Sequence, residues 1–206
     1  METKVTLYGA SGHCKVVIDI LNLNEISIEQ IVDDNPAVGS LVGIPVVLSK
    51  KFTKEDNLII AIGDNLIRKK ISNKNNANYI KLIHPKTTIS PFATIEKGTV
   101  VMAGAIINSD SKIGVHCIIN TRALIEHDCT IGNFAHISPK AALAGNVTVG
   151  EGTQIGIGAI IIQGVKIGKW CIIGAGAVII RDVPDYAVVV GNPGEIIKYQ
   201  DQKLYV

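Results

Sequence analysis

An aliphatic residue recurs at every sixth position of this chain over one long, unbroken stretch. The stretch runs from Ile89 to Ile179, and valine or leucine takes the place of isoleucine at only a few positions. A period of six fits neither an α-helix nor a hairpin sheet, whose patterns repeat about every 3.6 and every 2 residues. It is typical of a parallel β-helix, in which each hexapeptide contributes one short strand and one turn. Three hexapeptides then close a triangular coil of about eighteen residues.

The residues around each aliphatic position support this fold. The position four residues later is small or modest in size, as at Ala105 and Ala159. We expect the large aliphatic side chain to fill the corner of the prism, with the small side chain beside it. Glycine often follows the aliphatic residue, where we expect it to relieve a tight turn that needs a positive φ. These glycines are Gly114, Gly132, Gly150, Gly156, Gly168 and Gly174.

The cysteines follow the same register. Cys117, Cys129 and Cys171 occupy the small inward position, which favours a packing role over a nucleophile. A covalent acyl-cysteine intermediate is therefore not expected. The four cysteines show no CxxC spacing, and we expect free thiols in a reducing compartment.

Composition excludes several classes of partner. The net charge is +2, and the basic clusters at residues 50–51 and 68–70 are short, which indicates solvated faces and not a nucleic-acid surface. No apolar run reaches the roughly 18 residues that span a membrane, and no signal-like segment opens the chain. We therefore expect a cytoplasmic protein that binds neither nucleic acid nor membrane.

The first 83 residues do not follow the period of six. Apolar strand patterns alternate with helical patterns, in the order typical of a βαβαβ unit. The expected strands are residues 5–8, 31–32, 58–64 and 79–83, and the expected helices are residues 13–23 and 65–73. The sequence therefore predicts an α/β front domain ahead of the β-helix.

Two features of the front domain point to a nucleotide. Gly9, Ser11 and Gly12 form a turn after the first strand, so backbone N–H groups at a helix N-terminus can bind a diphosphate. Asp33 and Asp34 follow the second strand, where an acidic side chain can accept from a ribose or base. The complete GxGxxG pattern is missing, so a nicotinamide cofactor is not implied. A helix-capping turn in a purely structural domain remains the alternative.

Histidine is the natural general base, and His127 is the best candidate among five. It lies away from the inward positions between Glu126 and Asp128, whose carboxylates can orient the ring and raise its basicity. An exposed, solvated histidine is the alternative. Gly145 follows one coil later, so its N–H is expected near His127, where it can serve a thioester oxygen.

The other histidines are assigned by position. His13 follows the glycine turn and is expected near the phosphates or the sugar of a substrate. His84 precedes Pro85 at the domain junction, where a structural role is favoured, and His116 is assigned to the surface.

Taken together, the two halves resemble one family of acetyltransferases. The resemblance is carried by short segments spread over nearly the whole chain: residues 9–13, 33–34, 60–65, 67–71, 83–85, 120–121, 125–129, 144–147 and 190–193. The chain is similar to the sugar O- and N-acetyltransferases related to the sialic acid O-acetyltransferase and to the UDP-4-amino-sugar N-acetyltransferase of bacillosamine synthesis.

The resemblance implies a homotrimer with a Rossmann-like nucleotide-sugar-binding domain at residues 1–84. It implies a left-handed β-helix acetyltransferase domain at residues 85–206, with acetyl-CoA bound between neighbouring β-helices. His127 matches the base, and Asp128 matches the supporting acid, which is often glutamate in the family. Further residues match contacts to the two substrates. These are His136, Gly145, Ile157 and Ala175 on the acetyl-CoA side, and Gly9, Ser11, Gly12, His13, Asp33, Asp34, Gly63 and Asn120 on the nucleotide-sugar side.

One segment departs from the family pattern. Residues 191–195 resemble its GNPAK segment, but Gly194 and Glu195 replace the alanine and the lysine. If that lysine holds the CoA phosphates, another cation must do so here. The alternatives are Lys166, Lys169 and Lys198.

Three functions follow as hypotheses. The favoured one is acetyl transfer from acetyl-CoA, without a metal, to a nucleotide-linked 4-amino-4,6-dideoxy sugar, with UDP as the preferred nucleotide. The second is O-acetylation of sialic acid or a related sugar. The third is a non-catalytic β-helix scaffold, which the flanked His127 disfavours.

Overall fold

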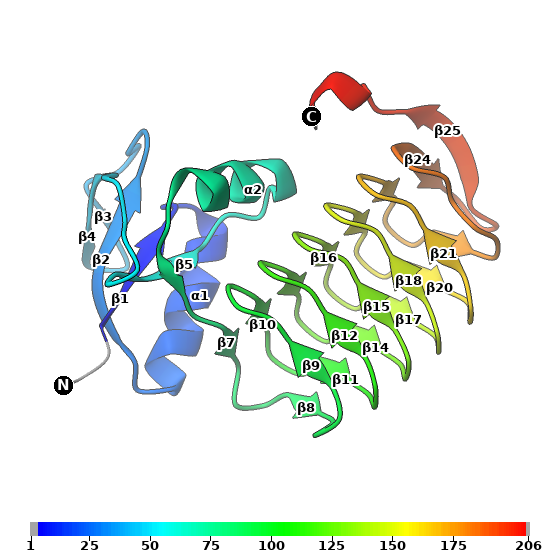
Figure 1. Cartoon of the computed structure of the whole chain (residues 1–206), viewed down its shortest axis with the longest axis horizontal. Helices are drawn as coiled ribbons and strands as arrows, with labels where there is room; N and C mark the ends of the chain where they lie inside the picture. The colour runs from blue at the N-terminus through cyan, green and yellow to red at the C-terminus, as the bar shows by residue number, and fades with distance from the viewer. Residues whose placement is uncertain (1–3, 205–206) are drawn as a thin grey trace.

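The repeat folds into a parallel β-helix, to one end of which an α/β domain is attached (Figure 1). The structure is a computed structural model that describes residues 4–204. Each coil crosses three parallel sheets, and paired residues in successive coils are eighteen positions apart, as for Val100 and Ile118.

The first sheet contains β7 (Leu82–Ile83), β10 (Val100–Val101), β13 (Ile118–Ile119), β16 (His136–Ile137), β19 (Gln154–Ile155), β22 (Ile172–Ile173), β24 (Ala187–Val190) and the antiparallel β25 (Glu195–Tyr199). The second sheet contains β8 (Thr88–Ile89), β11 (Ile106–Ile107), β14 (Leu124–Ile125), β17 (Ala142–Leu143), β20 (Ile160–Ile161) and β23 (Val178–Ile179). The third sheet contains β9 (Thr94–Ile95), β12 (Lys112–Ile113), β15 (Thr130–Ile131), β18 (Thr148–Val149) and β21 (Lys166–Ile167). A short 3-10 helix, η1 (Gln202–Leu204), follows β25.

Two-residue turns between the sheets form three edges along the β-helix. The first edge, between the first and second sheets, carries the turns at residues 85–86, 103–104, 121–122, 139–140, 157–158 and 175–176. The second edge, between the second and third sheets, carries those at 91–92, 109–110, 127–128, 145–146 and 163–164. The third edge, between the third and first sheets, carries those at 97–98, 115–116, 133–134, 151–152 and 169–170.

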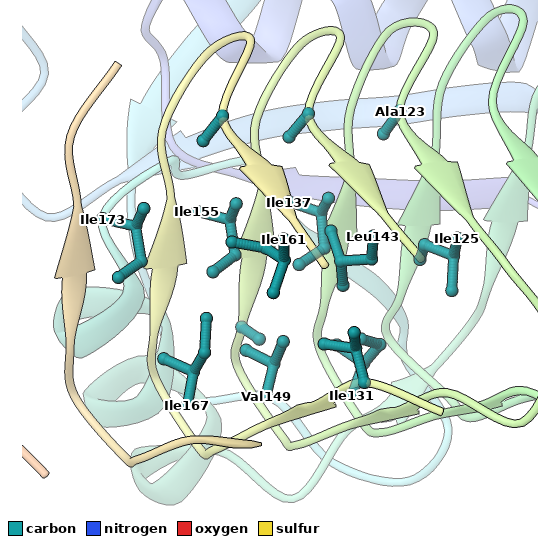
Figure 2. Packing of buried hydrophobic residues seen from close by; sticks show 14 of the residues in the cluster. Ala123, Ile125, Ile131, Ile137, Leu143, Val149, Ile155, Ile161, Ile167 and Ile173 are labelled. Carbon is teal, nitrogen blue, oxygen red and sulfur yellow. The ribbon is translucent and has the colours of Figure 1, made fainter. Parts of the chain in front are cut away.

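The periodic aliphatic residues fill the interior of the prism. Ile125, Leu143 and Ile161 stack one coil apart beneath the second sheet, as Figure 2 shows, and each is fully buried. The expectation that these side chains lie at the corners is wrong, because each is the second residue of a strand. The small residues precede the strands, next to the turns, where there is less room.

The role expected for the glycines was also wrong. The positive φ falls on the second residue of every turn from Gly98 to Gly176, with values between 54° and 74°. The glycines that follow the aliphatic residues have no positive φ and instead let successive coils approach closely. A Cβ at Gly114 would lie 2.8 Å from the backbone nitrogen of Asn133, and one at Gly150 would lie 2.5 Å from the carbonyl carbon of Gly168.

The front domain is a sheet in the order β3-β4-β2-β1-β5-β6, with two helices. Its elements are β1 (Lys4–Tyr8), α1 (Gly12–Leu23), β2 (Ser27–Asp33), β3 (Ser40–Leu41), β4 (Ile44–Leu48), β5 (Asn57–Ile60), α2 (Asn65–Lys74) and β6 (Asn78–Tyr79). The predicted pattern omitted the β3–β4 hairpin, whose second strand pairs in parallel with β2. The direction in which successive strands are added to the sheet reverses at β1, because β2 pairs on one side of β1 and β5 on the other.

The strand expected at residues 79–83 is two strands in different domains. Tyr79 ends β6 in the front sheet, whereas Leu82 and Ile83 form the first strand of the β-helix and pair with Val100 and Val101. Leu82, Val100 and Ile118 face outward from the first sheet, and all three are buried in one apolar cluster with residues of α1. The front domain therefore covers the first coils of this sheet.

Candidate active site

The predicted base, His127, lies in a turn on the second edge. Its Nδ1 donates to Oδ2 of Asp128 over 2.7 Å, so the other ring nitrogen, Nε2, is free to accept a proton. The two side chains are 61% and 58% exposed. The hydrogen bond to Asp128, together with the charges of Asp128 and Glu126, raises the pKa of His127. Only one of the two flanking carboxylates holds the ring, because Glu126 accepts from Asn108 Nδ2 over 2.9 Å.

The backbone at Asp128 is compatible with an aspartate. Asp128 is the second residue of its turn and has a φ of 61°. Aspartate and asparagine tolerate this left-handed conformation better than longer side chains do, because their short polar groups bond locally. Longer side chains hold the same conformation in equivalent turns, as at Arg122 and Lys140, so the turn suits an aspartate without requiring one.

Gly145 lies directly against the ring of His127. A Cβ at position 145 would come within 2.6 Å of Cε1 and 2.7 Å of Nε2 of His127, so no larger residue fits while the ring stays in place. Among residues 4–204 the N–H of Gly145 has no hydrogen-bond partner, whereas its carbonyl accepts from Gly164. A free N–H beside the base has the placement of an oxyanion donor.

A second group of predicted residues lines a cleft at the end of β1. Gly9, Ser11, Asp33 and Asp34 surround a cavity of about 270 Å³, together with Ile62. The cleft lies where the strand order reverses, at the carboxyl ends of the parallel strands, which is where α/β sheets bind ligands.

The glycine turn is shaped by close contacts. Gly9 has a φ of 109°, and a Cβ there would lie 2.4 Å from Cγ1 of Ile62. Gly12 begins α1, and a Cβ on it would meet nothing within 4 Å. Ser11 is the N-cap of α1, but its side chain makes no capping bond. The first turn of α1 is thus open to an anion.

The two aspartates have different hydrogen-bond partners and different roles. Both oxygens of Asp33 accept from backbone N–H groups, Oδ2 from Ala10 and Oδ1 from Asn35, each over 2.9 Å, so Asp33 fixes the glycine turn. Oδ1 of Asp34 accepts from the hydroxyl groups of Ser49 and Tyr8. These two hydrogen bonds lower the pKa of Asp34, and the bond from Ser49 has the larger effect. The carboxylate is therefore ionised and held at the rim of the cleft.

A third group lies where the front domain meets the β-helix. Asn120 Nδ2 donates to Nε2 of His136 over 3.0 Å. Burial, the charge of Arg68 and the neighbouring His13 lower the pKa of His136 to about 3, although a backbone hydrogen bond at Gly63 opposes this shift. Burial and Arg68 likewise lower the pKa of His13 to about 4. The buried Nε2 of His13 has no partner among residues 4–204. Both rings are therefore neutral at physiological pH.

Within one chain these groups do not form a single site. His127, Asp128 and Gly145 lie on the second edge, whereas Asn120 immediately precedes a turn of the first edge. Ile157 and Ala175, which resemblance places in the acetyl-CoA groove, also lie on the first edge, and Ile157 is 54% exposed. The side chains assigned to the two substrates are thus divided between two edges and the front domain.

Two residues were misjudged from sequence. His116 was assigned to the surface, but it is 2% exposed, and its ring stacks on Phe134 at 5.3 Å between centroids. Arg68 was expected on a solvated basic face, but it is 1% exposed. Both lie within the contact between α2 and the third edge. The period of six carries no information on which outward positions another domain covers. The roles of Tyr8 and Ser49 also gave no sequence signal, since each depends on a contact with Asp34.

The possible replacements for the family lysine lie apart from one another. Lys166 is in β21 of the third sheet, and Lys198 is in β25. Lys169 is on the third edge, 3.9 Å from Asp185. Which of them contacts CoA phosphates stays a prediction.

No helix within residues 4–204 is long and apolar enough to cross a membrane. The same residues contain no cluster of three or more His, Cys, Asp or Glu side chains able to hold a metal ion.

Comparison with known proteins gives a consistent picture. The PglD N-terminal domain family matches residues 4–75, and the bacterial transferase hexapeptide family matches residues 146–181. The UDP-N-acetylbacillosamine N-acetyltransferase of Bacillus subtilis (strain 168) is 38% identical over 110 residues. That stretch is 48% of this chain and spans about half the length of the relative, 51%.

Solved structures match over nearly the whole chain. PerB from Caulobacter crescentus, in complex with CoA and GDP-perosamine, is 38% identical with a TM-score of 0.89, over 96% of this chain and 99% of that one. The acetyltransferase domain of PglB from Neisseria gonorrhoeae FA1090, in complex with acetyl coenzyme A, is 37% identical with a TM-score of 0.89, over 96% and 100%. These matches confirm the predicted fold class, an α/β front domain followed by a left-handed β-helix.

Proposed function

Because this chain belongs to the family of hexapeptide-repeat sugar acetyltransferases with a PglD-type N-terminal domain, we propose that it transfers an acetyl group from acetyl-CoA to the amine of a nucleotide-linked 4-amino-4,6-dideoxy sugar. The observation that carries the proposal is the His127–Asp128 pair packed against Gly145, whose N–H has no partner among residues 4–204. The Bacillus subtilis relative and the PglB domain are acetyltransferases, and PerB binds CoA together with a nucleotide-linked sugar. A further matching structure is a GDP-perosamine N-acetyltransferase from Caulobacter crescentus. This favours an N-acetyltransferase over a scaffold and over an O-acetyltransferase of free sialic acid.

The geometry supports direct transfer in a ternary complex. The sugar amine attacks the thioester carbonyl, so a C–N bond forms and the C–S bond breaks. Nε2 of His127 accepts the proton that the amine loses and returns it to the departing CoA thiolate. The Gly145 N–H donates to the oxyanion of the tetrahedral intermediate. The buried cysteines offer no acyl-enzyme route, because burial raises the pKa of Cys117 to about 12 and also raises that of Cys129.

We assign the nucleotide sugar to the front cleft, which is the cavity at the end of β1 that Gly9, Ser11, Asp33, Asp34 and Ile62 surround. The open first turn of α1 suits the diphosphate, and Asp34 at the rim suits a ribose hydroxyl or a base N–H. His13, Asn120 and His136 lie at the domain junction, where the sugar would extend toward the β-helix. The family resemblance places His136 on the acetyl-CoA side, but we assign it to the acceptor side, because its ring accepts from Asn120 and bonds to the backbone of Gly63. We propose UDP as the nucleotide, in line with the bacillosamine relative, and GDP as the alternative that the perosamine complex favours.

We further propose a homotrimer, because one chain separates the base from the acceptor cleft. The outer face of the second sheet is apolar, with Ile106 37% and Ile160 48% exposed, whereas that of the third sheet carries lysine and threonine. The edges that flank the second sheet have opposite charges. The first edge carries Lys86, Arg122 and Lys140, and on or beside the second edge lie Asp110, Glu126 and Asp128.

These surfaces favour a closed ring in which the first edge of one subunit meets the second edge of the next. Such a ring brings His127 of one copy to the acceptor side of its neighbour, with acetyl-CoA between them. Light scattering should give a particle near three times 21.9 kDa. A fully active monomer at micromolar concentration would contradict the ring. We place the enzyme in the cytoplasm, where its four buried free cysteines would stay reduced.

A turnover screen tests the activity. The wild-type protein is given acetyl-CoA with UDP-, dTDP- and GDP-linked 4-amino-4,6-dideoxy sugars, and with sialic acid as the hydroxyl acceptor. We expect CoA release with an amino sugar, with intersecting double-reciprocal lines. Turnover on sialic acid alone, or on none of these acceptors, contradicts the proposal, and parallel lines contradict the ternary complex.

A further inference from the structure

Arg68, in the first half of α2, is a fully buried cation that uses every one of its donors. Its Nε donates to the carbonyl of His116 over 2.9 Å. Nη1 donates to the carbonyls of Ile62 and Gly63 over 3.1 and 3.0 Å, and Nη2 donates to Asn65 Oδ1 and to the carbonyl of Phe134 over 2.9 and 2.8 Å. A guanidinium has five N–H groups, so none is left unpaired.

All five acceptors are neutral. None of the ion pairs within residues 4–204 includes Arg68, and burial lowers the pKa of Arg68 to about 10. A buried charge without a counter-ion is expensive, and an apolar side chain of similar volume often stabilises a fold as well or better. Stability alone is therefore a weak reason for an arginine here, and its bonding pattern gives a more specific one.

The acceptors belong to two parts of the molecule. Ile62 and Gly63 lie in the loop between β5 and α2 of the front domain, whereas His116 and Phe134 occupy successive turns of the third edge. Neighbouring residues of α2 continue the same contact. Asn65 Nδ2 donates to the carbonyl of Gly152 over 2.9 Å, and Lys69 pairs with Glu151 over 2.6 Å. Arg68 is thus the centre of the contact between α2 and the β-helix.

The loop that Arg68 holds also shapes the acceptor site. Ile62 is a wall of the front cleft and packs against the glycine turn, so its position sets the width of the cleft. Gly63 makes a backbone hydrogen bond with His136, which in turn accepts from Asn120. One guanidinium therefore fixes the cleft wall in the front domain relative to two polar side chains of the β-helix.

We propose that Arg68 is a positioning residue for the acceptor, which locks the 62–63 loop to the third edge so that the front cleft and the Asn120–His136 pair form one nucleotide-sugar site. The inference rests on the proposed function. Arg68 would act only through the position of the acceptor, and a misplacement of a substrate by about 1 Å can lower the rate by about 10². Arg68 makes none of its bonds to the second edge, where His127 lies. Its loss should therefore affect the nucleotide sugar and leave acetyl-CoA binding unchanged.

The test uses substitutions that remove the bonds to different degrees. Arg68→Lys keeps the charge but has three donors on one atom, and Arg68→Met removes both charge and donors. Lys70→Met, an exposed position on the same helix, is the control. We expect both Arg68 variants to raise KM for the nucleotide sugar about tenfold or more and to lower kcat, with KM for acetyl-CoA within about twofold of wild type. Lys70→Met should behave as wild type.

Stability is kept separate from positioning by the same measurements. A merely structural role would lower the amount of folded enzyme and its maximal rate, but leave both KM values unchanged, and that result would overturn the inference. An equal rise in both KM values would also overturn it. If Arg68→Met does not fold, Arg68→Lys and the milder Asn65→Ala, which removes one acceptor, carry the test, with a smaller change in the same direction expected for Asn65→Ala.

Binding without turnover separates this inference from the proposed function. Calorimetry with UDP and with GDP should show weaker binding to Arg68→Lys than to wild type. A wild-type protein that binds neither nucleotide and acetylates no amino sugar contradicts the proposed function. A wild-type protein that does both, beside an Arg68→Lys variant of equal nucleotide affinity and equal KM, contradicts only the role of Arg68.

Discussion

The second edge and the domain junction hold histidines in opposite states. On the second edge His127 is exposed and bonded to a carboxylate, which raises its pKa. At the junction His136 is half-buried near a cation, and its partial burial, with the charge of Arg68, lowers its pKa to about 3. The same side chain is thus more basic than usual in one place and neutral at physiological pH in the other. Environment assigns the proton-transfer role to His127 and leaves His136 only a neutral hydrogen-bonding role.

The largest expected effect is loss of the base. His127→Ala should lower kcat by about 10² to 10⁴, with modest changes in KM, because proton transfer is lost while both binding sites remain. The β-helix should stay folded, since the side chain lies outside the prism. Steady-state kinetics on an accepted amino sugar measure this.

The control must be an exposed residue, and His116 does not qualify because it is buried under α2. Lys112→Ala, on the outer face of the third sheet, is the matched substitution. Equal activity of the His127 and Lys112 variants would mean that His127 is not the base, and the contrast between the two regions would then have no catalytic meaning.

The next effect concerns the ring's orientation. Gly145→Ala places a methyl group within 2.7 Å of His127 Nε2, so the ring must move. We expect kcat to fall by about 10², since small misplacements at a reacting centre have effects of this size. Gly39→Ala is the control, because a Cβ there meets nothing within 4 Å. Full activity of Gly145→Ala, measured beside this control, would show that the ring works in another position.

The sequence predicts the β-helix and its second edge better than it predicts the domain junction. The β-helix was predictable because every coil repeats the same local contacts, so a strict period reveals both strands and turns. His127 could be found because its partner is the adjacent Asp128. Its assignment as the base stays a prediction, although the geometry accommodates it.

The junction was not predictable in the same way. Arg68 bonds to His116 and Phe134, which lie far along the chain, and nothing local to residues 68–70 separates the buried arginine from its solvated neighbours. The glycines show a related limit. The period marks their positions, but only the structure shows that Gly114 and Gly150 allow coil contact and that other residues adopt the positive φ.

The third prediction concerns acid stability at the junction. The pKa values of His13, His116 and His136 are about 4, 4 and 3 in the folded chain, against about 6.5 when unfolded. As the pH falls from 7 to 5, the unfolded chain binds protons that the folded chain cannot, so the free energy of unfolding decreases. Each of these histidines costs about 2 kcal/mol at pH 5.

His136→Gln should therefore reduce the loss of stability between pH 7 and pH 5 by about 2 kcal/mol. Urea unfolding at fixed protein concentration measures it. His127→Gln is the contrasting variant, because a raised pKa stabilises the folded chain as the pH falls, and its removal should not reduce the loss. An identical decrease in wild type and His136→Gln would show that His136 is protonated in the folded state.

The smallest effect sharpens the role of Asp128. Asp128→Asn keeps the short polar side chain that tolerates a φ of 61°, so the turn should not change. It removes the carboxylate that raises the pKa of His127. Because only the neutral ring accepts a proton, the wild-type rate should rise with pH through an apparent pKa above 6.5. In Asp128→Asn this rise should shift to lower pH, and the plateau should fall about tenfold, since the ring is less basic and less firmly oriented.

The pH dependence of kcat/KM, with saturating acetyl-CoA, gives both quantities at once. Asp110→Asn is a matched control, because Asp110 occupies the equivalent turn one coil earlier, with a φ of 61°, but has no histidine before it. A lower plateau without a shift would mean that Asp128 only orients the ring. A shift toward higher pH would mean that the titrating group is not His127, because loss of a neighbouring negative charge can only lower the pKa of a histidine. The position of the acid limb, more than the size of the rate loss, therefore identifies the base.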